Sequence, residues 1–304
     1  MIEDTFAEKT CLRFEGVYCP SITITHDDGT IDYESWGRHL DHLIGAGING
    51  VLLFGSIGEF YAFPTEIKEQ VVDFVAKHVA GRIDVLVGVG GTNLAEVIEF
   101  SRYAGNAGAS ALVAISPYYF GPSDSAAERY FGAVASATSL PVILYNFPAR
   151  SGNDLSPELV CRIVSANPTI VGIKDTVDTI SHTRKVVAAV RQINPSFSVL
   201  SGYDEYYVSN RVFGGNGVLS GLTNVEPETF VAMHRAWESG DYAGAIRAAA
   251  RISHLMKIYD CADLFISAIK GAVRVKGLPI STSVREPAVQ LTDSQLGEIR
   301  TLLD

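Results

Sequence analysis

Residues 170–178 read IVGIKDTVD, an apolar and β-branched run that ends in polar residues, among them a lysine. A short run of this composition is typical of a buried β-strand. Similar runs recur along the chain, and each is followed by an amphipathic segment rich in Ala, Glu and Arg. Because strands that alternate with helices usually pair in parallel, the pattern predicts a parallel sheet. The predicted strands cover residues 16–25, 50–55, 84–90, 111–117, 141–147, 170–175, 198–203 and 217–221.

The number and spacing of these units predict an α/β fold. Eight strand and helix units within about 240 residues is the size of a (β/α)8 TIM barrel, and a doubly wound open sheet is the main alternative. Helical patterns at 241–256, 260–275 and 292–303 predict a C-terminal helical extension. We expect residues 1–224 to form the barrel core with the catalytic site. Residues 225–304 should form the eighth barrel helix and a C-terminal helical bundle, which packs on the barrel because no linker separates the two parts.

The composition favours a globular protein that acts on small molecules. Hydrophobic residues make up 47% of the chain, enough to build a large core. The formal net charge of −10 and the lack of a basic tract argue against nucleic-acid and membrane partners. The first ten residues lack the cationic and apolar segments of a signal peptide, and no run is long enough to span a membrane. These features predict a cytoplasmic protein.

Cysteine and histidine are dispersed along the sequence. Cys11, Cys19, Cys161 and Cys261 show no CxxC spacing, which predicts reduced thiols rather than a zinc site or a disulfide framework. The seven histidines form no HxH or HExxH pair. We therefore expect no metal in the site.

Lys174 is the first candidate for chemistry. Side chains alternate along a strand, so Lys174 and Gly172 share one face, and active sites of such barrels lie at the carboxyl ends of the strands. A partly desolvated lysine loses its proton readily and attacks a ketone to form a Schiff base. The alternative interpretation is a solvent-facing lysine paired with Asp175.

Two other predicted strands end in residues that suit the same reaction. Tyr145 lies near the end of its strand, within reach of Lys174, and can transfer protons. The stretch FGSIGEF at 54–60 is a glycine-bracketed turn whose backbone N–H groups suit a carboxylate, and Ser56 adds a hydroxyl group there. Alternatively, Tyr145 is an ordinary core aromatic and the turn only a turn.

Five motifs occur together in this order: GSIGE at 55–59, SPYYF at 116–120, YNFPARSG at 145–152, GIKD at 172–175 and GGNGVLSG at 214–221. They resemble the dihydrodipicolinate synthase and N-acetylneuraminate lyase family of class I aldolases over nearly the whole chain. The resemblance implies a TIM barrel with a C-terminal helical bundle and a pyruvate-type 2-oxo acid bound as a Schiff base. It also implies that no cofactor is needed and that the protein is a homotetramer, built as a dimer of dimers.

The resemblance also implies a role for individual residues. Lys174 would form the Schiff base and Tyr145 would act as general acid and base. Ser56 would link Tyr145 to a tyrosine from the neighbouring subunit, and Tyr119 matches that partner. The backbone of the turn after Gly55, at Ser56 and Ile57, would bind the 2-oxo acid carboxylate.

The main chain of Leu219 would line the same pocket. Arg150 stands where dihydrodipicolinate synthases hold the carboxylate of their aldehyde substrate by a two-pronged contact. Alternatively, Arg150 is a rim residue that pairs with Asp154 or another surface acid.

The choice of substrate stays open between classes. Ile57 replaces the threonine usual in dihydrodipicolinate synthases, and the motifs at 58–60, 172–176 and 201–205 are similar to the branch that acts on 2-keto-3-deoxy sugar acids. That branch cleaves its substrate to pyruvate and an aldehyde, which is the function we favour. The alternatives are dihydrodipicolinate synthase, suggested by Arg150, a sugar acid dehydratase that uses the same imine, and a catalytically silent metabolite-binding barrel.

Overall fold

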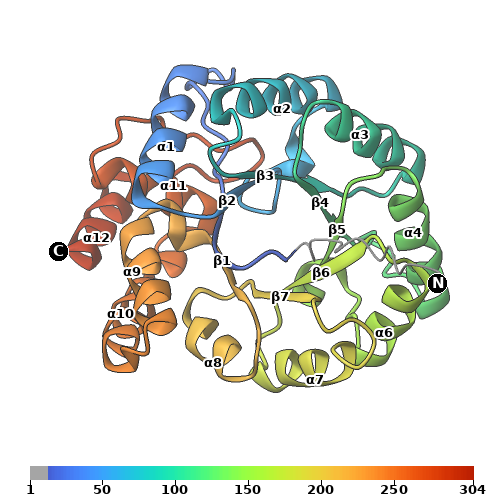
Figure 1. Cartoon of the computed structure of the whole chain (residues 1–304). Helices are drawn as coiled ribbons and strands as arrows, with labels where there is room; N and C mark the ends of the chain where they lie inside the picture. Colours follow the sequence, from blue (N-terminus) through green and yellow to red (C-terminus); the bar gives the residue numbers. More distant parts are fainter. Residues whose placement is uncertain (1–12) are drawn as a thin grey trace, which may run out of the picture.

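The computed structural model describes residues 13–304, and its centre is a closed barrel of eight parallel strands (Figure 1). The predicted TIM barrel is therefore confirmed and the open sheet is excluded. The amino-terminal residues and Cys11, considered above, lie outside the described residues. The strands are β1 (Gly16–Pro20), β2 (Gly50–Leu53), β3 (Asp84–Val89), β4 (Ala111–Ile115), β5 (Val142–Asn146), β6 (Ile170–Asp175), β7 (Ser198–Ser201) and β8 (Gly217–Leu219).

Helices cover the outside of the barrel, and their starts follow from local sequence. The side chain of Asp32 accepts a hydrogen bond from the N–H of Ser35, and Ser156 caps the N–H of Leu159 just before Pro157 takes the first helical position. A short helix, α5 (Pro148–Ser151), follows β5 at the barrel mouth. The outer helices are α1 (Tyr33–Ala46), α2 (Thr65–Val79), α3 (Leu94–Asn106), α4 (Asp124–Ser136), α6 (Pro157–Ala166), α7 (Ile180–Val190), α8 (Tyr207–Val212) and α9 (Pro227–Glu238).

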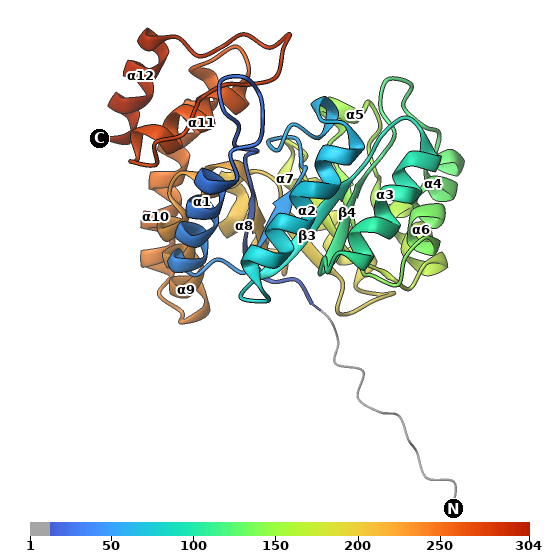
Figure 2. The ribbon, with the colours of Figure 1, turned by 90° about the horizontal axis from the view of Figure 1, so that it is seen from above.

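The C-terminal extension packs on one side of the barrel. Figure 2 shows α11 and α12 on the side of the barrel that carries α1 and α9. The helix expected over 260–275 begins only at Phe265, because the chain first forms the 3-10 helix η4 and a short bend. The elements are α10 (Tyr242–Leu255), η4 (Met256–Asp260), α11 (Phe265–Val275) and α12 (Asp293–Leu303).

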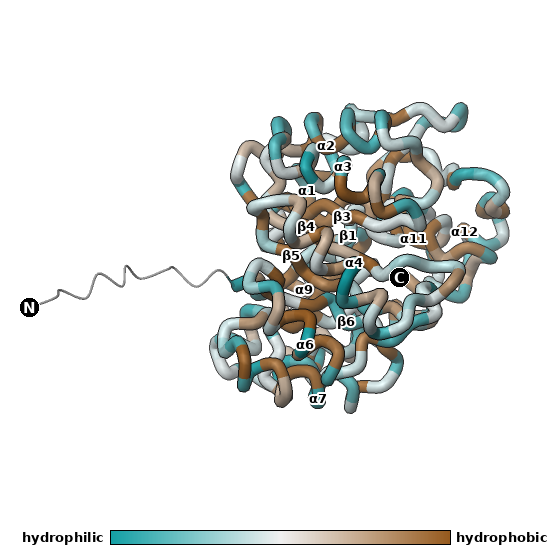
Figure 3. The backbone as a smooth tube through the Cα atoms, turned by 90° about the vertical axis from the view of Figure 1, so that its right-hand side faces the viewer, coloured by the Kyte–Doolittle hydropathy of each residue, from teal (hydrophilic) through white to brown (hydrophobic). Residues whose placement is uncertain are grey.

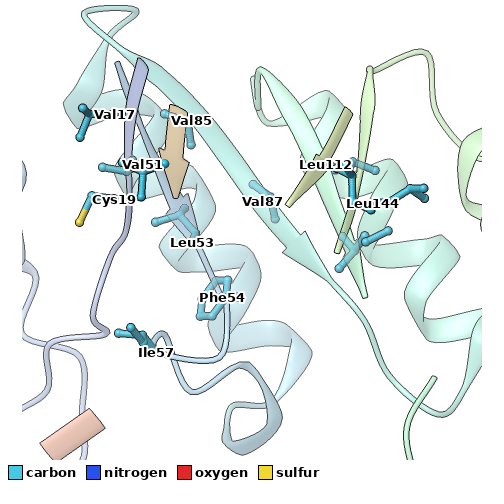
Figure 4. Close-up of a cluster of buried hydrophobic side chains, with 14 of the residues drawn as sticks. Val17, Cys19, Val51, Leu53, Phe54, Ile57, Val85, Val87, Leu112 and Leu144 are labelled. Carbon is cyan, nitrogen blue, oxygen red and sulfur yellow. The ribbon is translucent and has the colours of Figure 1, made fainter. Parts of the chain in front are cut away.

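The strands bury both faces, as expected for a parallel sheet between helices and a filled lumen. Alternate residues of β2, Val51 and Leu53, face the helix layer, where they lie beside Val85 and Val87 of β3 (Figure 4). Leu52 points the other way, into the barrel lumen. There it belongs to a second cluster, called the lumen cluster below, which includes Tyr18, Leu86, Val113, Ile143, Tyr145, Leu200 and Leu219. Figure 3 shows the hydrophobic segments gathered along the strands, with polar segments around them. Among residues 13–304, no helix is both long and apolar enough to cross a membrane.

Candidate active site

Lys174 and Tyr145 lie side by side at the carboxyl ends of β6 and β5, where they are partners in the strand register. Lys174 is only 4% exposed, and its Nζ atom lies 4.2 Å from the centre of the Tyr145 ring. Within residues 13–304, Nζ has no hydrogen-bond or ion-pair partner. The interpretation of Lys174 as a solvent-facing partner of Asp175 is therefore wrong.

Two small residues keep the strands around Lys174 close. A Cβ atom on Gly172 would lie 2.9 Å from the carbonyl oxygen of Ser198 on β7, closer than such contacts allow. On Gly202, which follows β7, a Cβ would collide with the hydroxyl group of Thr176. Glycine at both positions lets β6 and β7 approach each other beside the lysine.

The turn after β2 brings Ser56 to the tyrosine. The Ser56 Oγ and Tyr145 Oη atoms are 3.2 Å apart, a hydrogen-bond distance in which either can donate. Phe54 and Glu59, on both sides of the turn, have left-handed backbones with φ of 53° and 55°. Within the described part of the chain, the N–H groups of Ser56 and Ile57 have no acceptor. Two free donors beside a hydroxyl group are suited to a carboxylate.

A cavity of about 330 Å³ opens above these residues. Its wall is apolar at Ile57, Phe147 and Phe265 and polar toward β7 and β8. The hydroxyl group of Thr176 is buried there and has no hydrogen-bond partner within residues 13–304. A buried polar group without a partner costs free energy, so a ligand hydroxyl in this cavity would be stabilised by it. The cavity is lined by Pro20, Ser56, Ile57, Tyr145, Phe147, Arg150, Lys174, Thr176, Gly202, Tyr203, Asp204, Ser220, Gly221, Met256, Tyr259, Asp260 and Phe265.

Two residues expected at the pocket lie beside it. Gly55 lines a narrow space below the cavity, next to Phe60 and Tyr145. Leu219 is fully buried in the lumen cluster, and the next two residues, Ser220 and Gly221, form the cavity wall instead. The chain leaves β8 after Leu219. The cavity wall is therefore formed by the residues that follow the strand and not by Leu219.

Arg150 and Tyr119 occupy different parts of the rim. The guanidinium group of Arg150 is exposed at the cavity edge, with its carbon 5.9 Å from the ring centre of Phe147 and 5.8 Å from that of Phe265. No ion pair of Arg150 with Asp154 or any other acid is found in residues 13–304, so this arginine is available to a ligand. Tyr119 does not line the cavity of its own chain and is 86% exposed, with a left-handed φ of 77°.

A buried acid and its partner also line the cavity, and neither was predicted from the sequence. Asp204 accepts hydrogen bonds from the Leu222 N–H at 2.8 Å and from the Tyr259 hydroxyl at 2.7 Å. Burial raises the pKa of the Asp204 carboxyl above its ordinary value and raises the pKa of Tyr259 well above 10. Asp204 lies in the segment at 201–205 that marked the sugar-acid branch, which was its only signal. Tyr259 comes from η4 and carries no local signal.

The sequence predicts a site without a metal ion. Among the described residues, no group of three or more His, Cys, Asp and Glu side chains converges as metal ligands do. The described side chains at the cavity include a buried amine, a phenol, hydroxyl groups, two carboxyl groups and the guanidinium group of Arg150.

Comparison with known proteins identifies the family. The model of the dihydrodipicolinate synthetase family matches residues 13–304. YagE of Escherichia coli (strain K12), named provisionally as a 2-dehydro-3-deoxy-D-gluconate aldolase, is 38% identical to this chain, over 95% of this chain and 96% of YagE. YjhH of the same strain, named provisionally as a 2-dehydro-3-deoxy-D-pentonate aldolase, is 35% identical over 96% of this chain and 97% of YjhH.

Other members of the family have a different named activity. The 4-hydroxy-tetrahydrodipicolinate synthase of Gluconacetobacter diazotrophicus is 33% identical, over 95% of this chain and 96% of that protein. The crystal structure of YagE in complex with pyruvate superimposes with a TM-score of 0.94, at 38% identity, over 95% of this chain and 97% of that chain. The protein is therefore a lyase of the aldolase type that belongs to the dihydrodipicolinate synthetase family.

Proposed function

We propose that the protein is a class I aldolase that cleaves a 2-keto-3-deoxy sugar acid to pyruvate and an aldehyde. The observation that carries the proposal is the buried Lys174 amine, which has no partner in residues 13–304 and lies against Tyr145 at the floor of the cavity. An amine in this setting is suited to attack on a ketone. The same set of residues would have no chemical use in a silent metabolite-binding barrel.

The residues of the site support the following steps. The substrate carboxylate binds the N–H groups of Ser56 and Ile57, which places the 2-keto carbon at Lys174. The amine adds to that carbon and water leaves, giving a protonated imine. Tyr145 then takes the proton of the C4 hydroxyl group, and the C3–C4 bond breaks to release the aldehyde.

The electron pair of the broken bond moves into the enamine of pyruvate, with the imine nitrogen as the acceptor. Proton return to C3 and hydrolysis release pyruvate and regenerate Lys174. The Ser56 hydroxyl, 3.2 Å from the phenol, is placed to receive or return the proton held by Tyr145. No cofactor takes part in this sequence, because the lysine supplies the electrophile.

The walls of the cavity support a hydroxylated substrate. Thr176, Tyr203 and Ser220 carry hydroxyl groups at the cavity, and that of Thr176 has no partner within residues 13–304. Such groups favour a sugar chain over an apolar one. The similarity to YagE and YjhH supports the same substrate class, as does the pyruvate bound to YagE.

Arg150 favours a second candidate, dihydrodipicolinate synthase. Its guanidinium group stands at the cavity edge, and within the described residues no acid pairs with it. An arginine in that state is suited to the carboxylate of aspartate semialdehyde, which would condense with the pyruvate enamine. A sugar acid dehydratase would use the same imine and expel a hydroxyl group instead of an aldehyde.

A second copy of the chain is proposed to complete the site. Tyr119 is 86% exposed beside the equally exposed Phe120, and it does not line the cavity of its own chain. We propose that Tyr119 reaches the Ser56 and Tyr145 hydroxyl groups of a neighbouring copy, within a homotetramer built as a dimer of dimers.

Borohydride trapping tests the proposed function. The protein is incubated with 2-keto-3-deoxygluconate or with pyruvate, reduced, and the modified peptide is mapped by mass spectrometry. A pyruvyl adduct on Lys174 from the sugar acid is the expected result. A dehydrated full-length adduct would indicate a dehydratase. An adduct that forms with pyruvate but not with the sugar acid would favour the synthase. If neither compound labels Lys174, the Schiff-base mechanism is wrong.

A further inference from the structure

The two catalytic strands carry a second pair of residues on their outer face. Asn146 and Asp175 directly follow Tyr145 and Lys174, and they are partners in the same strand register. Because side chains alternate along a strand, this pair points to the helix layer when Tyr145 and Lys174 point to the lumen. The Asn146 Nδ2 atom donates a hydrogen bond to the Asp175 carboxylate at 3.2 Å. The reacting pair thus has a hydrogen-bonded pair behind it.

Asp175 is the centre of this outer cluster. Its side chain has no exposed area, and besides Asn146 it accepts from the Thr183 hydroxyl at 2.7 Å and contacts the His182 Nδ1 atom at 3.0 Å. The carboxylate therefore joins three elements, β5, β6 and α7. A buried carboxylate is costly unless several donors satisfy it, and here three donors do.

Asn146 extends the cluster to the chain after β5. Its Nδ2 atom also donates to Asp154 at 3.0 Å, and its Oδ1 atom accepts from the Leu155 N–H at 3.0 Å. Backbone hydrogen bonds continue the pairing of the strand ends: Thr176 N–H donates to the carbonyl oxygen of Asn146 at 2.8 Å. The side chain and the main chain of Asn146 are thus both fixed.

His182 balances the charge of the cluster. It lies between Asp175, at 3.0 Å, and Asp154, whose oxygen is 3.5 Å from the Nε2 atom. Burial alone would lower the pKa of His182, but its hydrogen bond to Asp175 and the charges of Asp175 and Asp154 raise it above the ordinary value. When the ring is protonated, it lies between two carboxylates and offsets part of their negative charge beside the strand that carries Lys174.

We propose that Asp175 is a positioning residue, which holds the Lys174 amine at the Tyr145 ring by clamping β6 to β5 and α7 from the outer face. The proposal rests on the proposed roles of Lys174 and Tyr145. Burial of a carboxylate adds little to stability, since apolar residues of similar volume are often as stable. Directed hydrogen bonds do, however, fix the strand ends, and a misplacement of about 1 Å between reacting groups costs about a hundredfold in rate.

Asp175→Asn tests the clamp, because the shape is kept while the charge and one acceptor oxygen are lost. The expected result is a fall in kcat of about tenfold to a hundredfold, with KM for the sugar acid changed less than about twofold. Pyruvate should still be trapped on Lys174, at a lower rate. The pH profile of kcat should also change, because His182 loses its charged partner.

A matched control separates positioning from stability. Glu226 is another buried carboxylate, which binds Arg251 and Thr229 and does not line the cavity. Glu226→Gln should lower the melting temperature at least as much as Asp175→Asn without a change in kcat. If Asp175→Asn does not fold, Thr183→Val, which removes one donor from α7, should lower kcat about threefold to tenfold at unchanged KM.

Wild-type kcat and pH profile in a folded Asp175→Asn protein would overturn the proposal. A fall in kcat no larger than that of Glu226→Gln would overturn it as well. Trapping in the wild-type protein distinguishes this failure from failure of the proposed function. If wild type gives the Lys174 adduct, only the clamp is wrong; if wild type gives none, the aldolase mechanism itself is wrong.

Discussion

Two lysines are buried among residues 13–304, and they differ in their partners. Lys270, on α11, is 1% exposed and donates at 2.6 Å both to the Glu59 carboxylate and to the carbonyl oxygen of Ser283. Lys174, on β6, is 4% exposed and has neither kind of partner within residues 13–304. Burying an ammonium group is costly in both places, and only Lys270 has a carboxylate that offsets the cost.

The difference separates a lysine that is paired within the fold from one that is proposed to react. Glu59 follows the turn of Ser56 and Ile57, and its other oxygen accepts from the Arg285 N–H at 2.9 Å. The pair therefore fastens the C-terminal extension to the turn that is proposed to bind the carboxylate. Burial lowers the pKa of Lys270, and the charge of Glu59 acts in the opposite direction. Its amine is occupied by two acceptors and is not available to a substrate.

The largest effect is expected from substitution of Lys174, the buried lysine without a partner in residues 13–304. Lys174→Met should reduce cleavage by at least about ten-thousandfold, because Lys174 is the only lysine among the described residues that line the cavity. The same change should leave the free energy of unfolding equal or higher, since it removes a buried amine without a partner. Turnover and urea unfolding are measured on the same preparation. Residual activity within a factor of ten of wild type would refute the assignment.

Lys270→Met should give the opposite result. Leaving Glu59 buried without its partner should lower the free energy of unfolding by about 3–5 kcal/mol. Lys276→Met is the control, because Lys276 is 43% exposed and lies 3.5 Å from Glu226, a pair expected to contribute less than about 1 kcal/mol.

Combination with Glu59→Leu sharpens this result. The double variant should recover part of the loss, because the unpaired carboxylate is gone. Chemical unfolding monitored by circular dichroism gives the free energy of unfolding of Lys270→Met, of Lys276→Met and of the double variant. Equal losses in Lys270→Met and Lys276→Met would mean that the buried pair does not hold the extension.

Thr176 extends the comparison from lysines to hydroxyl groups. Its buried hydroxyl has no partner within residues 13–304, whereas that of Thr229 donates to Glu226 at 2.9 Å. Thr176→Val should lower kcat/KM for the sugar acid about tenfold while KM for pyruvate in the trapping reaction stays constant. Thr229→Val should cost about 1 kcal/mol of stability without changing kcat/KM. If Thr176→Val weakened pyruvate binding equally, the hydroxyl group would contact the pyruvate part of the substrate and not its sugar chain.

Local patterns were sufficient to predict the fold and the positions of Lys174, Tyr145 and Ser56 at the barrel mouth. The apolar runs that alternate with amphipathic segments specify the parallel barrel, and the two-residue period of β6 predicts that Lys174 faces the lumen. The same period explains why the alternative pairing of Lys174 with Asp175 is wrong, since neighbours in a strand point to opposite faces. Tyr145 and Ser56 were found in the same way, from their places at strand ends.

The rest of the site depends on tertiary contacts that no local pattern reports. Met256, Tyr259 and Phe265 reach the cavity from the C-terminal extension, far along the chain from Lys174. The end of β8 was also predicted two residues too late, because the chain leaves the strand after Leu219 and brings Ser220 and Gly221 to the wall. Tyr119 is 86% exposed in a single chain, and its proposed role needs a second copy that a sequence does not position.

The smallest expected effect concerns two histidines with opposite shifts. The pKa of His182 is raised, as described above, whereas burial lowers the pKa of His234, which shares a hydrogen bond with the Tyr207 hydroxyl at 2.7 Å. Above the unfolded pKa of about 6.5, folded His182 binds more protons than the unfolded chain. The stability from His182 is therefore complete below pH 6.5 and is lost as the pH rises through the folded pKa. His234 disfavours its charged form, so its effect is a gain of stability as the pH rises toward about 6.5.

Single variants separate the two histidines. His182→Asn should flatten the decline of stability above pH 6.5, and His234→Gln should flatten the rise below it. The free energy of unfolding is measured in urea at closely spaced pH values for wild type and both variants. A decline above pH 6.5 that persists unchanged in His182→Asn would mean that the ring is neutral between Asp175 and Asp154. The outer face of β6 would then carry the uncompensated charge of Asp175, and the charge balance inferred for the clamp would be wrong.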